Sequence, residues 1–133
     1  MKVIYEKQDD IFDISKGARI YDGASIDEDP GVVLHFGTDG GRDIVAVTVM
    51  GASYWFKKGY DETSDTWLLG DTTSDPSLIT KDGDFVGYWK PDEFDPNELP
   101  DPIGVEIRHV SKHLASVRHY LEEPVKAANQ PQA

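Results

Sequence analysis

Residues 60–69 read Tyr-Asp-Glu-Thr-Ser-Asp-Thr-Trp-Leu-Leu, and their spacing of key side chains occurs once before in the chain. The earlier copy lies at a constant offset of 55 residues. The matched pairs are Tyr5 and Tyr60, Asp10 and Asp65, Phe12 and Trp67, and Ile14 and Leu69. Self-similarity at one offset is typical of a duplicated unit. The sequence therefore predicts two diverged copies of one strand-rich unit.

Two further sets of matches extend the repeat at slightly different offsets, as expected if the connecting loops differ in length. At an offset of 58, the matches are Val45, Val47, Val49, Ala52 and Ser53 with Ile103, Val105, Ile107, Val110 and Ser111. At an offset of 52, they are Gly31, Val33 and Phe36 with Gly83, Phe85 and Tyr88. The second copy leads into a helix, whereas the first leads straight into an aromatic run. We therefore predict that the first copy lacks the helix.

Strand patterns dominate both copies, because short runs of β-branched and aromatic residues alternate with turn residues. Residues 38–41, Thr-Asp-Gly-Gly, favour a hairpin that pairs Val32–Phe36 with Ile44–Val49 antiparallel. Within the latter strand, alternate valines are expected to face the core. The predicted strands are Val3–Tyr5, Ile11–Ile14, Val32–Phe36, Ile44–Val49, Tyr54–Phe56, Thr66–Leu69, Phe85–Trp89 and Ile103–Ile107.

One segment has helical spacing, with Ser111 as its expected N-cap and Leu114, Val117 and Leu121 on one face. We predict a helix over Lys112–Glu123, ended by a proline, and a disordered tail over 124–133. The expected fold is α+β, a mostly antiparallel arrangement of two β-rich repeats with one C-terminal helix. The domain spans 1–123, with repeats at about 1–56 and 57–123.

Composition narrows the classes of function. The 133 residues suit one domain, and the absence of cysteine excludes disulfides and thiolate chemistry. The net charge is −12, and residues 61–101 contribute −10 of it, which argues against direct nucleic-acid or membrane binding. The N-terminal residues lack a secretory-signal pattern, and no apolar run is long enough for a membrane helix. We expect a cytoplasmic protein.

The repeat motifs carry a family resemblance. Residues 60–69 and residues 103–112, which read Ile-Gly-Val-Glu-Ile-Arg-His-Val-Ser-Lys, resemble the opening and closing motifs of a small bacterial family, the domain of unknown function numbered 2283. The chain departs from the family at Trp67-Leu68-Leu69, where the family has Leu-Tyr-Ile, and in an acidic proline-rich segment over 90–102. The resemblance implies a small α+β unit, no established activity, and an association with toxin-like genes that suggests an antitoxin or immunity role.

The titratable clusters admit structural and catalytic interpretations. Asp61, Glu62 and Asp65 form a group of carboxylates. Asp61 and Asp65 are better explained as acceptors of backbone N–H bonds in the hairpin turn than as part of a catalytic pair or a calcium loop. His109 and His113 lie four residues apart with no evident third ligand, and His119 is on another face of the predicted helix. We therefore assign no catalytic residue, no metal ligand and no cofactor.

The acidic segment is the remaining candidate for function, because Asp92, Glu93, Phe94 and Asp95 place a ring among carboxylates. Such a surface could bind a basic partner protein, whereas the plainer interpretation is solubility. We therefore predict a non-enzymatic binding protein, with antitoxin-like or inhibitor-like action as the sharpest version. The alternative is a small metal-dependent or hydrolytic enzyme that uses Asp61, Asp65 or the two histidines. The two repeats could pack within one chain as the subunits of a dimer would, but the sequence does not determine the oligomeric state.

Overall fold

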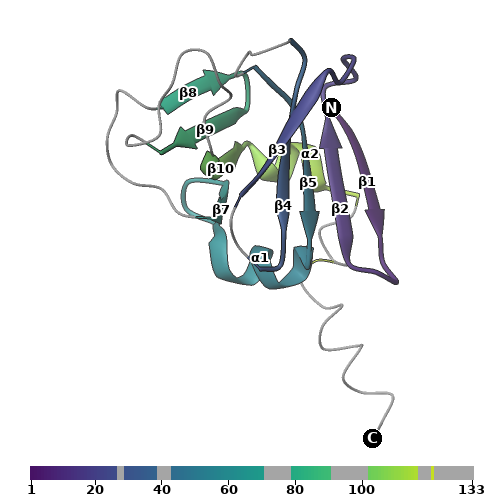
Figure 1. Cartoon of the computed structure of the whole chain (residues 1–133). Coiled ribbons are helices and arrows are strands. Elements are labelled where there is room, and N and C mark those ends of the chain that lie inside the picture. The colour runs from purple at the N-terminus through teal and green to yellow at the C-terminus, as the bar shows by residue number, and fades with distance from the viewer. Residues whose placement is uncertain (27–28, 39–42, 71–78, 91–101, 117–120, 122–133) are drawn as a thin grey trace, which may run out of the picture.

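The computed structural model describes residues 1–26, 29–38, 43–70, 79–90, 102–116 and 121. Its first five strands form one antiparallel sheet in the order β1-β2-β5-β4-β3 (Figure 1). These strands are β1 (Lys2–Glu6), β2 (Ile11–Ser15), β3 (Asp22–Ile26), β4 (Val32–Phe36) and β5 (Ile44–Met50). The helix α1 (Ala52–Gly59) follows β5 and leads into the second half of the chain.

The second sheet repeats the first strand for strand, in the order β6-β7-β10-β9-β8, again with antiparallel neighbours. Its strands are β6 (Tyr60–Asp61), β7 (Thr66–Gly70), β8 (Ile79–Asp82), β9 (Phe85–Trp89) and β10 (Pro102–Arg108). The helix α2 (Val110–Leu114) follows β10 as α1 follows β5. The predicted α+β fold of two β-rich repeats is confirmed, and α1 spans the boundary expected at residues 56 and 57.

The register of the strands defines which residues of the two copies are equivalent. Val49 in β5 and Ile107 in β10 each pair with both neighbouring strands. Their partners are Phe12 and Val32 in the first sheet, and Trp67 and Phe85 in the second. The middle strands therefore correspond at an offset of 53, and the predicted 52 is wrong. The glycines that suggested 52 differ in position, because Gly31 directly precedes β4 whereas Gly83 lies two residues before β9.

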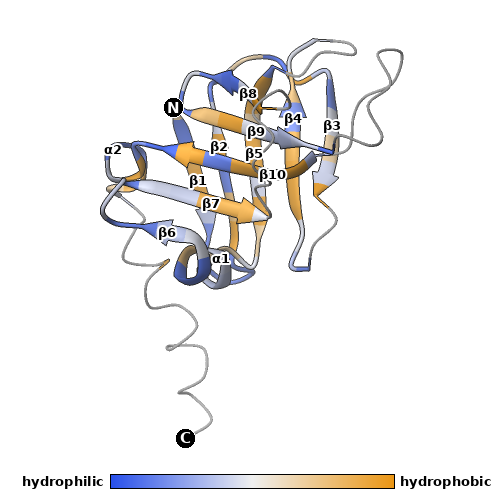
Figure 2. Ribbon diagram, turned by 90° about the vertical axis from the view of Figure 1, so that its left-hand side faces the viewer, coloured by the Kyte–Doolittle hydropathy of each residue, from blue (hydrophilic) through white to orange (hydrophobic). Residues whose placement is uncertain are grey.

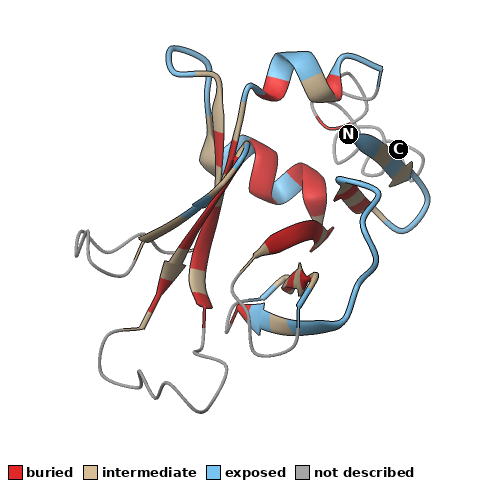
Figure 3. Ribbon diagram, turned by 90° about the horizontal axis from the view of Figure 1, so that it is seen from above, coloured by how far each residue is buried: buried red, intermediate tan, exposed pale blue. Residues whose placement is uncertain are grey.

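Equivalent aromatic residues of the two copies meet in the core between the sheets. The ring centroids of Phe12 and Trp67 are 5.3 Å apart, and those of Phe36 and Trp89 are 5.8 Å apart. Contacts between equivalent residues are what an approximate two-fold arrangement produces near its axis. The buried segments accordingly lie toward the inside of the molecule in Figure 3, and hydrophobic stretches run along β4, β5 and β9 in Figure 2.

The predicted core face of β5 needs one correction. Val47 and Val49 belong to the hydrophobic cluster between the sheets, as expected from their alternation. An irregularity in the pairing at Phe36 shifts the register, so that Ile44 joins this cluster while Val45, although buried, does not. Such a bulge turns the following side chain toward the other face of a strand.

The predicted strand Tyr54–Phe56 is wrong, and so is the prediction that the first copy lacks a helix. This run lies in α1, where Ala52, Trp55 and Phe56 are buried at helical spacing and Tyr54 is exposed. Each aromatic residue of the run favours a strand when it is considered alone. Trp55 and Phe56, however, form a buried helical face together with Ala52, and the burial of this face favours the helix. Trp55 and Trp67 are 1% and 0% exposed and therefore lie in the core.

The C-terminal helix begins earlier than predicted. Its N-cap is His109 rather than Ser111, and its first residue is Val110 rather than Lys112. Leu114 and Leu121 are buried as expected. The rest of the predicted helix face, the end of the helix, the tail over 124–133, the hairpin turn at 39–41 and the segment 91–101 lie outside the described residues. Within the described ranges, no helix has the length and apolar character needed to cross a membrane.

Candidate functional site

The carboxylate of Asp10 organises the first repeat. It lies in the turn between β1 and β2, where its φ is 54°, and accepts a hydrogen bond from the hydroxyl of Tyr5. It also accepts the backbone N–H of Ser53 at 3.1 Å and the hydroxyl of Ser53 at 2.6 Å. This carboxylate thus satisfies donors in the first turn of α1. Burial and this contact raise the pKa of the Tyr5 hydroxyl above its usual value.

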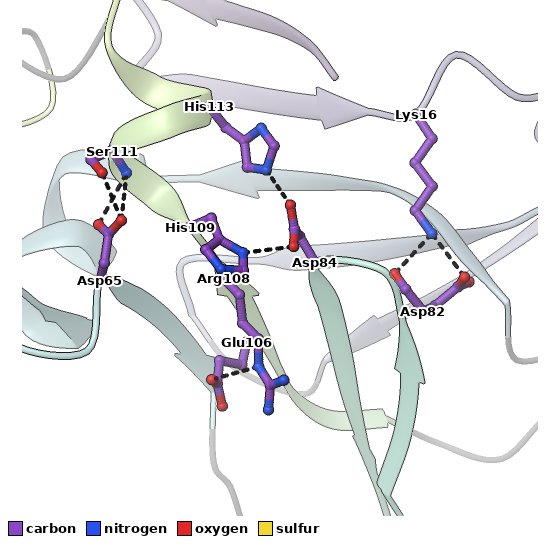
Figure 4. A network of polar contacts seen from close by, with 9 residues as sticks. All are labelled: Lys16, Asp65, Asp82, Asp84, Glu106, Arg108, His109, Ser111 and His113. Atoms are coloured by element: carbon purple, nitrogen blue, oxygen red, sulfur yellow. Dashed lines mark hydrogen bonds and ion pairs between the residues drawn. The ribbon is translucent and has the colours of Figure 1, made fainter.

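Asp65 plays the same part in the second repeat. Its Oδ1 atom accepts the hydroxyl of Tyr60 at 2.8 Å. The Oδ1 atom also accepts the backbone N–H of Ser111 at 3.0 Å, and the Oδ2 atom accepts the hydroxyl of Ser111 at 2.7 Å (Figure 4). Asp61 accepts the backbone N–H of Thr63 at 3.0 Å, which confirms its predicted use in the turn. The two repeats therefore use their matched aspartates to fix a hairpin to a helix.

A cluster that sequence reasoning missed joins the two histidines of the second repeat. His109 Nδ1 lies 2.8 Å from Asp84 Oδ1, and His113 Nε2 lies 2.5 Å from Asp84 Oδ2 (Figure 4). The hydrogen bond from His113, with help from His109, lowers the pKa of Asp84. Because the rings use opposite oxygens of one carboxylate, they do not converge on one point, and the described residues include no group of three that could hold a metal ion. His119 lies outside them.

Replacing Asp84 with asparagine is expected to reduce stability by about 1 kcal/mol at pH 7, in the upper part of the range for surface pairs. The lowered pKa means that the carboxylate contributes stability above its unfolded value of 3.8, and that this contribution disappears as the pH falls through the folded value. Urea unfolding at pH 7, 5 and 3 should therefore show the two proteins converging in acid. A difference as large at pH 3 as at pH 7 would contradict this assignment.

A hollow of about 250 Å³ opens on the outer face of the first sheet. Alternation places Asp13, His35 and Thr48 there, because each is flanked along its strand by core residues. Asp13 lies between Phe12 and Ile14, and Thr48 lies between Val47 and Val49. The residues that line the hollow are Lys2, Ile4, Asp13, Ser15, Ile20, His35, Ala46 and Thr48.

Three of these side chains form a directed chain of hydrogen bonds. Thr48 donates its hydroxyl to Asp13 Oδ1 at 2.5 Å, and His35 Nε2 lies 2.9 Å from the same hydroxyl oxygen. Since the hydroxyl proton is given to the carboxylate, the oxygen of Thr48 accepts the Nε2–H of His35. Burial lowers the pKa of His35 while the charge of Asp13 opposes that shift. A ring with a lowered pKa is neutral at pH 7.

This order of groups differs from a catalytic triad. A triad places histidine between the nucleophile and the acid, so that the ring can take the nucleophile's proton. Here Thr48 lies between His35 and Asp13, and both donors point toward the carboxylate. Asp13 therefore offers a negative charge and acceptor capacity to a donor group, while Lys2 adds one positive charge to the lining.

The outer face of the second sheet has diverged. The positions equivalent to Asp13, His35 and Thr48 hold Leu68, Tyr88 and Glu106. Tyr88 donates its hydroxyl to Glu106 at 2.9 Å, and Arg108 lies 3.4 Å from the same carboxylate. The two sheets share a fold but present different chemistry.

The predicted partner-binding residues Asp92, Glu93, Phe94 and Asp95 lie outside the described residues, so their part in binding stays a prediction. A scan against protein-family models, a search of curated proteins and a search of solved structures each found no match. The resemblance to the domain of unknown function 2283 likewise stays a prediction.

Proposed function

We propose that this chain is a small, acidic, non-enzymatic binding protein whose partner is a basic protein. The observation that supports this most strongly is the hollow on the first sheet, whose lining includes the carboxylate of Asp13 and the apolar side chains of Ile4 and Ile20. Ile4 and Ile20 are 48% and 49% exposed. Exposed apolar side chains grouped beside polar ones are typical of protein-binding surfaces.

The charge of the chain favours a basic partner. Twenty-five acidic residues against 13 basic ones give a net charge of −12. Complementary charge speeds association and discriminates against acidic partners. The segment containing Asp92, Glu93, Phe94 and Asp95 would add a second contact. Antitoxin-like or inhibitor-like action in the cytoplasm, in a relative of the domain of unknown function 2283, is the sharpest form of this proposal.

No observation on the described residues favours the enzymatic alternative over binding. Asp65 accepts bonds from Tyr60 and Ser111, and His109 and His113 both contact Asp84. The candidate catalytic residues of that alternative therefore make contacts that hold the fold together.

Affinity capture from source-cell lysate should test the proposal with three tagged proteins. They are the native chain, a variant with Asp92, Glu93, Phe94 and Asp95 changed to alanine, and a control with Glu6→Gln and Asp9→Asn. Captured proteins are identified by mass spectrometry, purified, and titrated against the bait at low and high salt. We expect a basic protein whose affinity falls with salt and is at least about tenfold weaker for the loop variant than for the control.

Two results would overturn the proposal. One is capture of the same proteins with equal affinity by all three baits and by a further bait with Asp13→Asn. The other is a purified partner that carries no basic surface and whose affinity does not change with salt.

A further inference from the structure

We infer that the hollow on the first sheet receives the guanidinium group of an arginine side chain carried by the basic partner. This inference rests on the proposed function and names the group that the surface recognises. It depends on one juxtaposition. Asp13 lines the same hollow as the apolar residues Ile4, Ile20 and Ala46, and Thr48 and His35 are hydrogen-bonded in a chain that ends on its carboxylate.

The hydrogen-bond pattern selects a donor as the ligand. Asp13 Oδ1 accepts the hydroxyl of Thr48, and a carboxylate has further lone pairs to offer. Thr48 donates its only hydroxyl hydrogen in the bond to Asp13, and His35 donates its Nε2–H in the bond to Thr48. Neither can donate into the hollow. Lys2 and Ser15 are the other donors in the lining, but a group that bonds to Asp13 itself must supply the hydrogen.

The walls select a ligand with an aliphatic stem. Ile4 from β1 and Ile20 from the segment after β2 flank the hollow, and Ala46 is part of its lining. A dry cavity of about 150 Å³ accommodates a benzene molecule, so about 250 Å³ is enough for one long side chain. Long basic side chains bury their methylene groups against apolar surface and keep the charged head on a polar group.

Arginine fits these walls better than lysine. Its guanidinium is planar, more weakly hydrated than an ammonium, and able to donate two parallel N–H bonds to one carboxylate.

A peptide source also fits better than a free small molecule, because the hollow opens on a broad sheet face. Residues flanking the arginine can pack on Ile4, Ile20 and the following Tyr21, which is 59% exposed.

The test is a titration of the ¹⁵N-labelled full chain with the capped peptide acetyl-Gly-Leu-Arg-Leu-Gly-amide at low salt. Matched peptides replace arginine with citrulline, which keeps the shape but not the charge, or with lysine. We expect saturable amide shifts at Asp13, His35, Ala46 and Thr48, with affinity at least about tenfold higher for arginine than for citrulline, as loss of a charge-assisted bond predicts.

Two variants of equal charge complete the test. Asp13→Asn keeps an acceptor for Thr48 but removes the charge, and it should weaken the arginine peptide by about tenfold. Asp9→Asn changes an exposed aspartate outside the hollow and should bind as the native chain does. Far-UV circular dichroism checks that both variants fold.

Several outcomes would overturn the inference. They are the absence of saturable shifts at the hollow, equal binding of the citrulline peptide, and equal effects of the two variants. Equal binding of the lysine peptide would overturn the choice of arginine, and binding of free agmatine as tight as the peptide would overturn the peptide source. A basic partner that loses affinity only when residues 92–95 are changed would sink this inference and leave the proposed function standing.

Discussion

Replacing Asp10 with alanine is expected to lower the free energy of unfolding by about 3 kcal/mol. The change removes the acceptor for Tyr5 and for two donors of Ser53, which is fully buried. Water cannot reach Ser53 to replace the lost bonds, so its hydroxyl and backbone N–H are left unsatisfied. Urea unfolding at pH 7 measures the loss.

The matched substitution Asp65→Ala provides an internal control. It removes the same set of contacts in the second repeat, from a residue with nearly the same positive φ of 55°. Ser111 is exposed, however, so water can take the place of the carboxylate. We expect a loss of about 1 kcal/mol. Equal losses from the two substitutions would show that burial of the capped serine does not set the cost.

Replacing Gly59 with alanine is expected to cost at least about 3 kcal/mol, because a Cβ atom has no room there. An added Cβ would lie 1.9 Å from the backbone carbonyl oxygen of Leu68, and a backbone atom cannot rotate away as a side chain can. Gly59 ends α1 and lets the helix approach β7 closely. The midpoint of urea unfolding should therefore fall sharply.

Gly17→Ala separates this effect from that of backbone conformation. Gly17 has a φ of +82°, yet an added Cβ would meet nothing within 4 Å. Only the cost of a left-handed conformation applies, about 1 kcal/mol. If Gly17→Ala proves as damaging as Gly59→Ala, crowding against Leu68 is not the reason for the glycine.

Much of the fold follows from local patterns in the sequence. Period-two alternation and the spacing of Tyr5 with Asp10 and of Tyr60 with Asp65 were enough to predict two strand-rich copies. The helix α1 was hidden by residues 54–56, whose aromatic side chains favour strands individually. Its signal was present, since Ala52 and Ser53 match the residues that begin α2 in the other copy.

The site was harder to predict because it depends on pairing between strands that are distant in the chain. Alternation alone indicates that Asp13, His35 and Thr48 point away from the core. Only the register of β2, β5 and β4 brings them together, with Asp13 directly opposite Thr48. The same reason hid Asp84, because it follows a turn 25 residues before His109 and has no distinctive neighbours in sequence.

The divergence of the two outer faces determines how many partners one molecule can engage. A symmetric pair of identical chains would carry two copies of the hollow and could cross-link its ligands or bind them with avidity. In the fused chain, Leu68, Tyr88 and Glu106 stand where the second hollow's Asp13, His35 and Thr48 would be. If the hollow binds a partner as proposed, the expected stoichiometry at this surface is therefore one partner per molecule.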